Sequence, residues 1–195
     1  YIEGMRKIFD LKIFLNPDDN LRLYWKITRD YIDRGHKPEQ TIKSAEEREK
    51  DRQAYIIPQM ELTDLIIRWI PTDSIKLGKE IEELVKKDYQ DRSQMLSLCE
   101  EPEKYLEITA LNSFDFTRLC EKLSEWKELY ILQEPLDTKW QKITLKGTIP
   151  SAAITAIAQD TIPEAEDFAF LKIPEDGMEG CLQLFFLFCL TKKMS

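Results

Sequence analysis

The residues best suited to chemistry in this 195-residue chain are cationic side chains that surround an expected helix break. Arg29 and Arg34 are five residues apart, roughly 140° around a helix, so they cannot share a face while the helix continues. Gly35 is expected to end the helix, which lets Arg34 fold back toward the ligand of Arg29. Two forked guanidinium groups suit phosphate oxygens better than lysines do. Spacing alone favours a charged helix surface with an Asp30–Arg34 ion pair, and phosphate handling is the alternative that these residue types allow.

Composition excludes several other classes of function. The net charge of −8 argues against general nucleic-acid binding, and the excess acid lies beyond residue 70, so phosphate handling is expected in the first third. His36 is the only histidine, and the cysteines show no CxxC spacing, which argues against a zinc site or a His-based triad. The run 181–190 is too short to span a bilayer, and no signal peptide is seen, so no membrane role is expected. The cysteines are predicted to be reduced core residues in a cytoplasmic protein; they are Cys99, Cys120, Cys181 and Cys189.

The first third has the pattern of strand, helix pair and strand. Residues 1–4 look like a strand end, the chain does not begin with Met, and we expect it to be cut from something longer. Residues 12–15 are typical of a buried parallel strand, and Asn16 is the expected cap of a helix that Gly35 ends. A second helix should begin at Pro38, and residues 65–70 form the next buried strand. This order indicates an α/β fold with parallel pairing. The expected apolar face of the first helix is Leu21, Tyr24, Trp25, Thr28 and Ile32.

The rest of the chain shows a different pattern. Residues 73–103 are expected to be a charged helical linker that ends near Pro102. Strand, helix and strand then follow twice, over 105–111, 116–126 and 129–133, and over 140–145, 151–162 and 168–173. This order predicts a small α+β domain of the ferredoxin-like, split-βαβ kind over 104–195, closed by an apolar helix at 178–193. The expected division is 1–72, 73–103 and 104–195.

Residues 1–71 resemble the C-terminal, lid-containing part of the phosphoribulokinase/uridine kinase family of P-loop kinases. The matching pieces are Ile2–Met5, Phe9–Leu15, Arg29-Asp30 with Arg34-Gly35-His36, Arg48, Ala54–Ile56 with Pro58-Gln59, and Asp64–Ile67 with Ile70-Pro71-Thr72. Their order and spacing are more specific than any single piece. The Arg-Gly-His segment and the Tyr-x-x-Pro-Gln segment favour the phosphoribulokinase branch.

The resemblance implies a role for each matching residue. Glu3 stands where the family has its Walker B acid, which helps to hold Mg²⁺ on the nucleotide. Arg29 and Arg34 match two lid arginines that stabilise the transferring phosphoryl group. Arg48 matches an arginine linked to sugar-phosphate handling, and His36 falls where uridine kinases can face the acceptor. For His36 a capping or surface role is the alternative, and for Glu3 a turn acid.

The chain also departs from the family pattern, because no GxxxxGK[ST] phosphate cradle occurs anywhere in it. The implied function is transfer of a phosphoryl group from Mg-ATP to a sugar-phosphate or nucleoside hydroxyl in the complete protein, with no activity in this chain alone. The alternative is a non-catalytic descendant that binds a partner protein, or itself, through residues 104–195.

Overall fold

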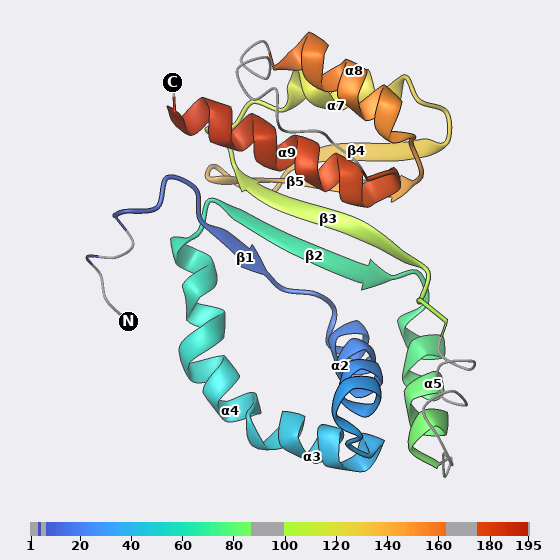
Figure 1. Ribbon diagram of the computed structural model, residues 1–195. Coiled ribbons are helices and arrows are strands. Elements are labelled where there is room, and N and C mark those ends of the chain that lie inside the picture. Colours follow the sequence, from blue (N-terminus) through green and yellow to red (C-terminus); the bar gives the residue numbers. More distant parts are fainter. Residues whose placement is uncertain (1–3, 5–6, 87–99, 163–174, 195) are drawn as a thin grey trace. The chain divides into compact units, whose positions relative to one another are not determined.

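The computed structural model describes residues 4, 7–86, 100–162 and 175–194. Its contacts divide the chain into two compact units (Figure 1). Unit 1 combines residues 1–14, 63–67 and 105–195, and unit 2 combines residues 15–62 and 68–104. Each unit therefore joins segments from both sides of the predicted boundary at residue 72. Whether 104–195 folds independently stays a prediction.

A five-stranded mixed sheet organises the fold, in the order β1-β2-β3-β5-β4. Backbone bonds join Asp64 N to Lys12 O and Asp18 N to Trp69 O, so residue numbers rise together and β1 and β2 are parallel, as predicted. From β3 onward the sheet is antiparallel, with Leu106 opposite Leu145 in the β3–β5 pair. The parallel sheet expected from the sequence is thus limited to its first pair in the described residues. The strands are β1 (Ile13–Leu15), β2 (Leu65–Pro71), β3 (Lys104–Leu111), β4 (Leu129–Pro135) and β5 (Trp140–Gly147).

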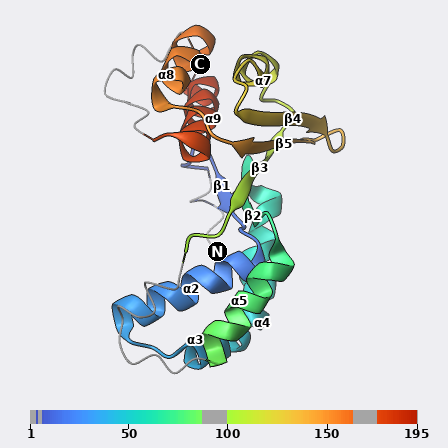
Figure 2. The ribbon, with the colours of Figure 1, turned by 90° about the vertical axis from the view of Figure 1, so that its right-hand side faces the viewer.

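In unit 1, three helices cover one face of β3, β4 and β5: α7 (Thr117–Ser124), α8 (Ser151–Thr161) and α9 (Gly177–Met194) (Figures 1 and 2). Phe116 packs its ring 5.0 Å from Phe185 and 5.1 Å from Phe188, measured between ring centroids. The apolar C-terminal helix therefore packs on its own domain, which is one of the two arrangements that its composition allowed. The predicted strand over 168–173 lies outside the described residues, so a ferredoxin-like arrangement stays a prediction.

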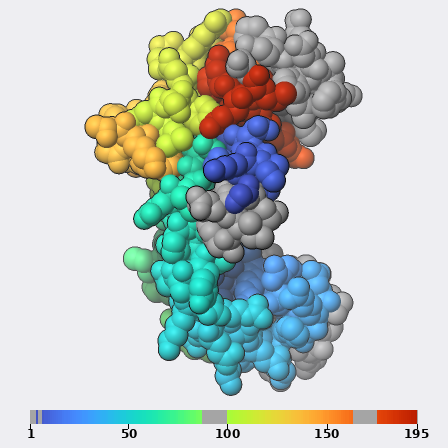
Figure 3. Space-filling model, turned by 90° about the vertical axis from the view of Figure 1, so that its left-hand side faces the viewer, coloured from blue at the N-terminus to red at the C-terminus, as the bar shows by residue number. Residues whose placement is uncertain are grey.

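In unit 2, α2 (Asp19–Arg34) packs on α5 (Ser74–Lys86), while α3 (Pro38–Glu47) and α4 (Glu49–Asp51) lead into a π-helical segment, Arg52–Ile56, and a 3-10 segment, Ile57–Leu62. The stretch after α4 lies at the surface, coloured cyan in Figure 3. The shared core of α2 and α5 consists of Leu21, Tyr24, Ile27, Leu77, Ile81 and Leu84.

Both ends of α2 follow from local chemistry. Asp18, not the predicted Asn16, caps its start, because the Asp18 carboxylate accepts the backbone N–H groups of Asn20 and Leu21 at 3.0 and 3.3 Å. Gly35 ends it as predicted, with φ of 69° in the left-handed region that glycine adopts without strain. The helix therefore stops directly after Arg34.

Three of the four cysteines lie in the core of unit 1, as predicted from the sequence. Cys120, Cys181 and Cys189 are buried free thiols, and burial raises the pKa of each to about 12. Such thiols are almost wholly protonated at neutral pH and react slowly. Cys99 lies outside the described residues. Among the helices that the structure describes, none is long and apolar enough to cross a membrane.

Strand β1 departs from its prediction as a buried strand. Only Phe14 is buried, whereas Ile13 is 36 % and Leu15 67 % exposed, because β1 is the last strand of the described sheet and nothing described covers its outer side. Ile8 and Phe9, just before it, are also exposed. An apolar edge strand with unpaired backbone groups is a template for association with another chain.

We therefore expect the 195-residue chain to self-associate through β1. Leu15→Lys places a charge on this edge and should shift the chain toward monomer, measured by sedimentation velocity at micromolar concentration. Ile75→Lys, at an exposed apolar position of α5, is the matched control and should leave association unchanged. A monodisperse wild-type monomer would contradict this expectation.

Candidate anion-binding site

The two arginines singled out in the sequence converge on one atom, which belongs to the protein itself. Arg29 donates from Nε and Nη2 to Asp30 Oδ1 at 3.0 and 2.8 Å, and Arg34 donates from Nη1 to the same oxygen at 3.3 Å. Asp30 is 4 % exposed, while both arginine side chains are more than half exposed. The ion pair between Asp30 and Arg34, the alternative interpretation of the spacing, is therefore present. The two guanidinium groups also lie close together, as the phosphate interpretation requires.

Asp30 remains ionised at this position. Burial would raise the pKa of its carboxyl, but the hydrogen bond from Arg29 and the charges of Arg29, Arg34 and Lys26 outweigh burial and lower it below the usual value. Asp30 therefore acts as a fixed negative anchor that orients both guanidinium groups. The backbone carbonyl of Asp30 also accepts the N–H of His36 at 3.1 Å, which fixes the turn after α2.

A cavity of about 520 Å³ opens between α2 and the α3–α4 segment of unit 2. Its lining carries five cationic side chains and one carboxylate, so positive charge prevails there. The volume lies within the range of small-molecule sites. The cavity brings together Arg29 and Arg48, two of the residues predicted from the sequence. The lining residues are Arg22, Trp25, Lys26, Arg29, Ala45, Arg48, Glu49 and Arg52.

Lys26 shows that positive charge in the cavity is incompletely neutralised. Burial lowers the pKa of its ammonium group, and nearby Arg48, Arg29 and Arg22 lower it further against the opposing effect of Asp30. Within the part of the chain that the structure describes, Lys26 and Arg48 have no ion-pair partner. An anion placed between them would relieve this repulsion and supply both with a partner.

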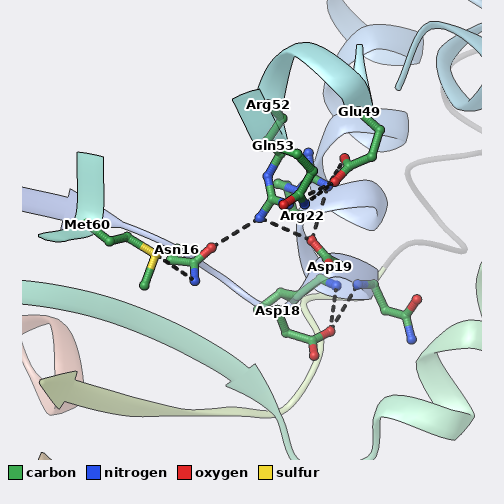
Figure 4. Close-up of polar contacts among 10 residues, drawn as sticks. Asn16, Asp18, Asp19, Arg22, Glu49, Arg52, Gln53 and Met60 are labelled. Atoms are coloured by element: carbon green, nitrogen blue, oxygen red, sulfur yellow. Dashed lines mark hydrogen bonds and ion pairs between the residues drawn. The ribbon is translucent and has the colours of Figure 1, made fainter. Parts of the chain in front are cut away.

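A network of ion pairs joins the cavity residues Arg22, Glu49 and Arg52 and is drawn in Figure 4. Arg22 Nη2 lies 3.1 Å from Asp19 Oδ1 and 3.6 Å from Glu49 Oε2. Arg52 Nη1 lies 3.1 Å from Glu49 Oε1, and its Nη2 lies 3.4 Å from Asp19 Oδ1 and donates to Asn16 Oδ1 at 3.1 Å. Arg52 is the least exposed cation of the network, at 16 %. The network fastens the start of α2 to α4 and so fixes the shape of this wall.

The remaining predicted site residues do not join the cavity. Arg34 is not among its lining residues, and it is linked to the lining residue Arg29 through the Asp30 carboxylate that both contact. His36 is exposed on the turn after α2, in agreement with a surface or capping role. Glu3 lies outside the described residues, and its metal role stays a prediction. Among the residues that were described, no group of three His, Cys, Asp or Glu side chains could hold a metal ion.

Sequence reasoning missed Arg22, Lys26 and Arg52. The signal was present, because residues 22, 26 and 29 are spaced i, i+4 and i+7 and share one face of α2. Arg48 and Arg52 repeat the i, i+4 spacing on the facing segment. The helix break at Gly35 points to Arg34, whereas this stripe of cations lies along the regular part of α2.

Comparison with known proteins places the cavity in a family context. Residues 1–76 match the sequence profile described as "Phosphoribulokinase / Uridine kinase family". The resemblance seen in the sequence is thus confirmed over this segment. All the lining residues of the cavity fall inside this segment.

Individual relatives give the same result at moderate identity. The chain is 36 % identical over 76 residues to a protein named phosphoribulokinase from Synechocystis, which is 39 % of this chain and 23 % of that protein. It is 37 % identical over 75 residues to the chloroplastic phosphoribulokinases of Chlamydomonas reinhardtii and Spinacia oleracea, which is 38 % of this chain and 20 % and 19 % of those proteins. The aligned part of the chain thus spans about a fifth of the length of these phosphoribulokinases.

Proposed function

We propose that the cavity of unit 2 binds the phosphate group of a small substrate in ATP-dependent phosphoryl transfer to a sugar-phosphate or nucleoside hydroxyl. The observation that supports this most is the unneutralised positive charge around Lys26 and Arg48, inside a segment related to phosphoribulokinases. Arg48 and Lys26 would contact the phosphate oxygens, and Arg29 would approach from the side of the Asp30 anchor. His36, on the adjoining turn, is the proposed contact to the acceptor.

Mg-ATP is the cofactor that such a reaction needs, and the residues of this chain do not fit it. The cradle for nucleotide phosphates, GxxxxGK[ST], is absent from the 195 residues, and the predicted metal acid Glu3 is not described. We therefore assign to this chain the binding and orientation of a phosphate group only, and propose that it does not catalyse transfer by itself. Mg-ATP should accordingly leave its melting temperature unchanged.

The proposal predicts that Arg48→Ala weakens binding of ribose 5-phosphate by about tenfold or more, since a charge-assisted hydrogen bond contributes roughly 1.5–3 kcal/mol. Binding can be measured by equilibrium dialysis at low ionic strength, because exposed charges are screened by salt. Arg118→Ala is the matched control, since Arg118 is an exposed arginine paired with Asp160 in unit 1. Equal effects of the two substitutions would contradict the proposal.

A second function is supported by one feature of unit 1. The edge strand β4 exposes Tyr130 at 56 % and Leu132 at 40 %, and Leu136 just beyond it is 51 % exposed. Exposed apolar side chains on an edge strand suit contact with another protein. If the chain binds no phosphate ester in the dialysis experiment, a protein-interaction role of residues 104–195 becomes the preferred function.

A further inference from the structure

The cavity contains one feature that phosphate binding alone does not require, a carboxylate among five cations. Glu49 is the only acid among the described residues that line it, and its side chain is 41 % exposed. A carboxylate in this position competes with a bound anion for Arg22 and Arg52 and lowers the affinity of the cavity for phosphate. A site for phosphate alone would be stronger without it.

The two oxygens of Glu49 are used differently. Oε1 accepts from Gln53 Nε2 at 2.7 Å and from Arg52 Nη1 at 3.1 Å. Oε2 has only the ion pair with Arg22 at 3.6 Å, and it accepts no hydrogen bond from the residues that the structure describes. The Oε1 contacts fix the orientation of the carboxylate and leave Oε2 with unused acceptor capacity.

Glu49 also stays ionised. The hydrogen bond from Gln53 lowers the pKa of its carboxyl, burial opposes this, and the hydrogen bond and charge of Arg52 and the charge of Arg22 lower it further. An ionised carboxylate accepts hydrogen bonds from hydroxyl groups strongly and can donate none.

We propose that Glu49 determines specificity in this cavity, by accepting a hydrogen bond at Oε2 from a hydroxyl group of the same molecule whose phosphate contacts Lys26 and Arg48. The ligand class is therefore a polyhydroxylated phosphate ester, and esters without hydroxyl groups are disfavoured. This inference rests on the proposed function, because it presupposes a phosphate between the cations. To that function it adds Glu49 as the residue that favours hydroxylated phosphate esters over esters without hydroxyl groups.

The test compares two ligands with the same phosphate headgroup, ribose 5-phosphate and ethyl phosphate, by equilibrium dialysis against the 195-residue chain. The wild type should bind ribose 5-phosphate more tightly. In Glu49→Gln the preference should fall by about tenfold, the change that about 1.4 kcal/mol produces. Affinity for ethyl phosphate should rise by about threefold, since a competing charge has been removed.

Two further variants separate charge from position. Glu49→Asp keeps the charge but withdraws the acceptor, so the preference should fall with no gain in ethyl phosphate affinity. Glu47→Gln removes an exposed carboxylate two residues away that does not line the cavity, and it should leave the affinity for both ligands unchanged. Circular dichroism melts check that each variant is folded. If Glu49→Gln is unfolded, Glu49→Asp alone provides the test.

The outcomes distinguish the two claims. If the wild type binds neither ester, the proposed function fails and this inference with it. If it binds both, but the preference is the same in the wild type and the Glu49 variants, the phosphate site stands and the role of Glu49 is wrong. If Glu47→Gln lowers the preference for ribose 5-phosphate as much as Glu49→Gln does, the change in net charge is the cause and the role of Glu49 is wrong.

Discussion

In a form of the protein that catalyses phosphoryl transfer, Arg34→Ala should lower kcat by roughly a thousandfold, the low end of the contribution of an arginine that stabilises the transferring group. KM for ATP should change far less, because such a cation acts mainly when charge moves in the transition state. The structure supports this through Asp30, whose carboxylate holds Arg29 and Arg34 side by side.

Steady-state kinetics with saturating acceptor provides the measurement, and Arg118→Ala in unit 1 is the control. Asp30→Asn should reproduce part of the loss, since it releases both guanidinium groups while leaving their charges in place. An equal loss of kcat in Arg34→Ala and Arg118→Ala would show that Arg34 has no special role in the reaction.

The second large effect is expected at Asp64, which is buried at the start of β2. Its Oδ2 accepts the backbone N–H of Lys12 at 2.8 Å and lies 3.4 Å from Lys12 Nζ, and its Oδ1 accepts from Lys193 Nζ at 3.0 Å. Lys193 Nζ also lies 5.7 Å from the centroid of the Phe114 ring. The carboxylate thus ties β1, β2 and the last turn of α9 together within unit 1.

Asp64→Asn should lower the free energy of unfolding by about 2 kcal/mol at pH 7, since hydrogen bonds to charged groups contribute roughly 1.5–3 kcal/mol and the lysines are partly solvated. Urea denaturation is the measurement, and exposed Asp33→Asn is the control.

The effect should depend on pH with a defined sign. Burial would raise the pKa of Asp64, but the Lys12 backbone hydrogen bond and the Lys193 and Lys12 charges lower it in the folded state. Stabilisation is then fully present above the unfolded value of about 3.9 and is lost as pH falls through the lower folded pKa. The difference between the wild type and Asp64→Asn should therefore shrink below about pH 4. A difference that stays constant down to pH 2 would contradict this account.

Local sequence signals predicted most of the elements, because these depend on nearby residues. Gly35 ends α2, Pro38 begins α3, and the alternating pattern of β3 buries Leu106, Ile108 and Ala110 on one face. The cap of α2 was misassigned by two residues, because both Asn16 and Asp18 suit that role. Asn16 instead accepts the hydrogen bond from Arg52, 36 residues away.

Features that depend on contacts distant in sequence were not predictable in the same way. The pairing of β2 with β3 brings residue 64 beside residue 111, and no local pattern encodes it. In the candidate site, Arg29 was predicted from its spacing around Gly35, and Arg48 through the family resemblance. Glu49 and Arg52 join the site only because the segment after α3 lies across the cavity from α2, which the sequence does not show. The spacing of cations along α2 can be seen in the sequence, but the sequence does not show that Arg48, Glu49 and Arg52 lie across the cavity from it.

The central claim, that the cavity between α2 and α4 is a phosphate site, is tested most directly by a crystal structure of the chain with tungstate. Tungstate is a tetrahedral oxyanion whose position is visible from anomalous scattering. The account predicts an anomalous peak within hydrogen-bond distance of at least two of Lys26, Arg29 and Arg48, and loss of that peak in Arg48→Ala. A cavity that stays empty at saturating tungstate, or a peak that persists in Arg48→Ala, would contradict it.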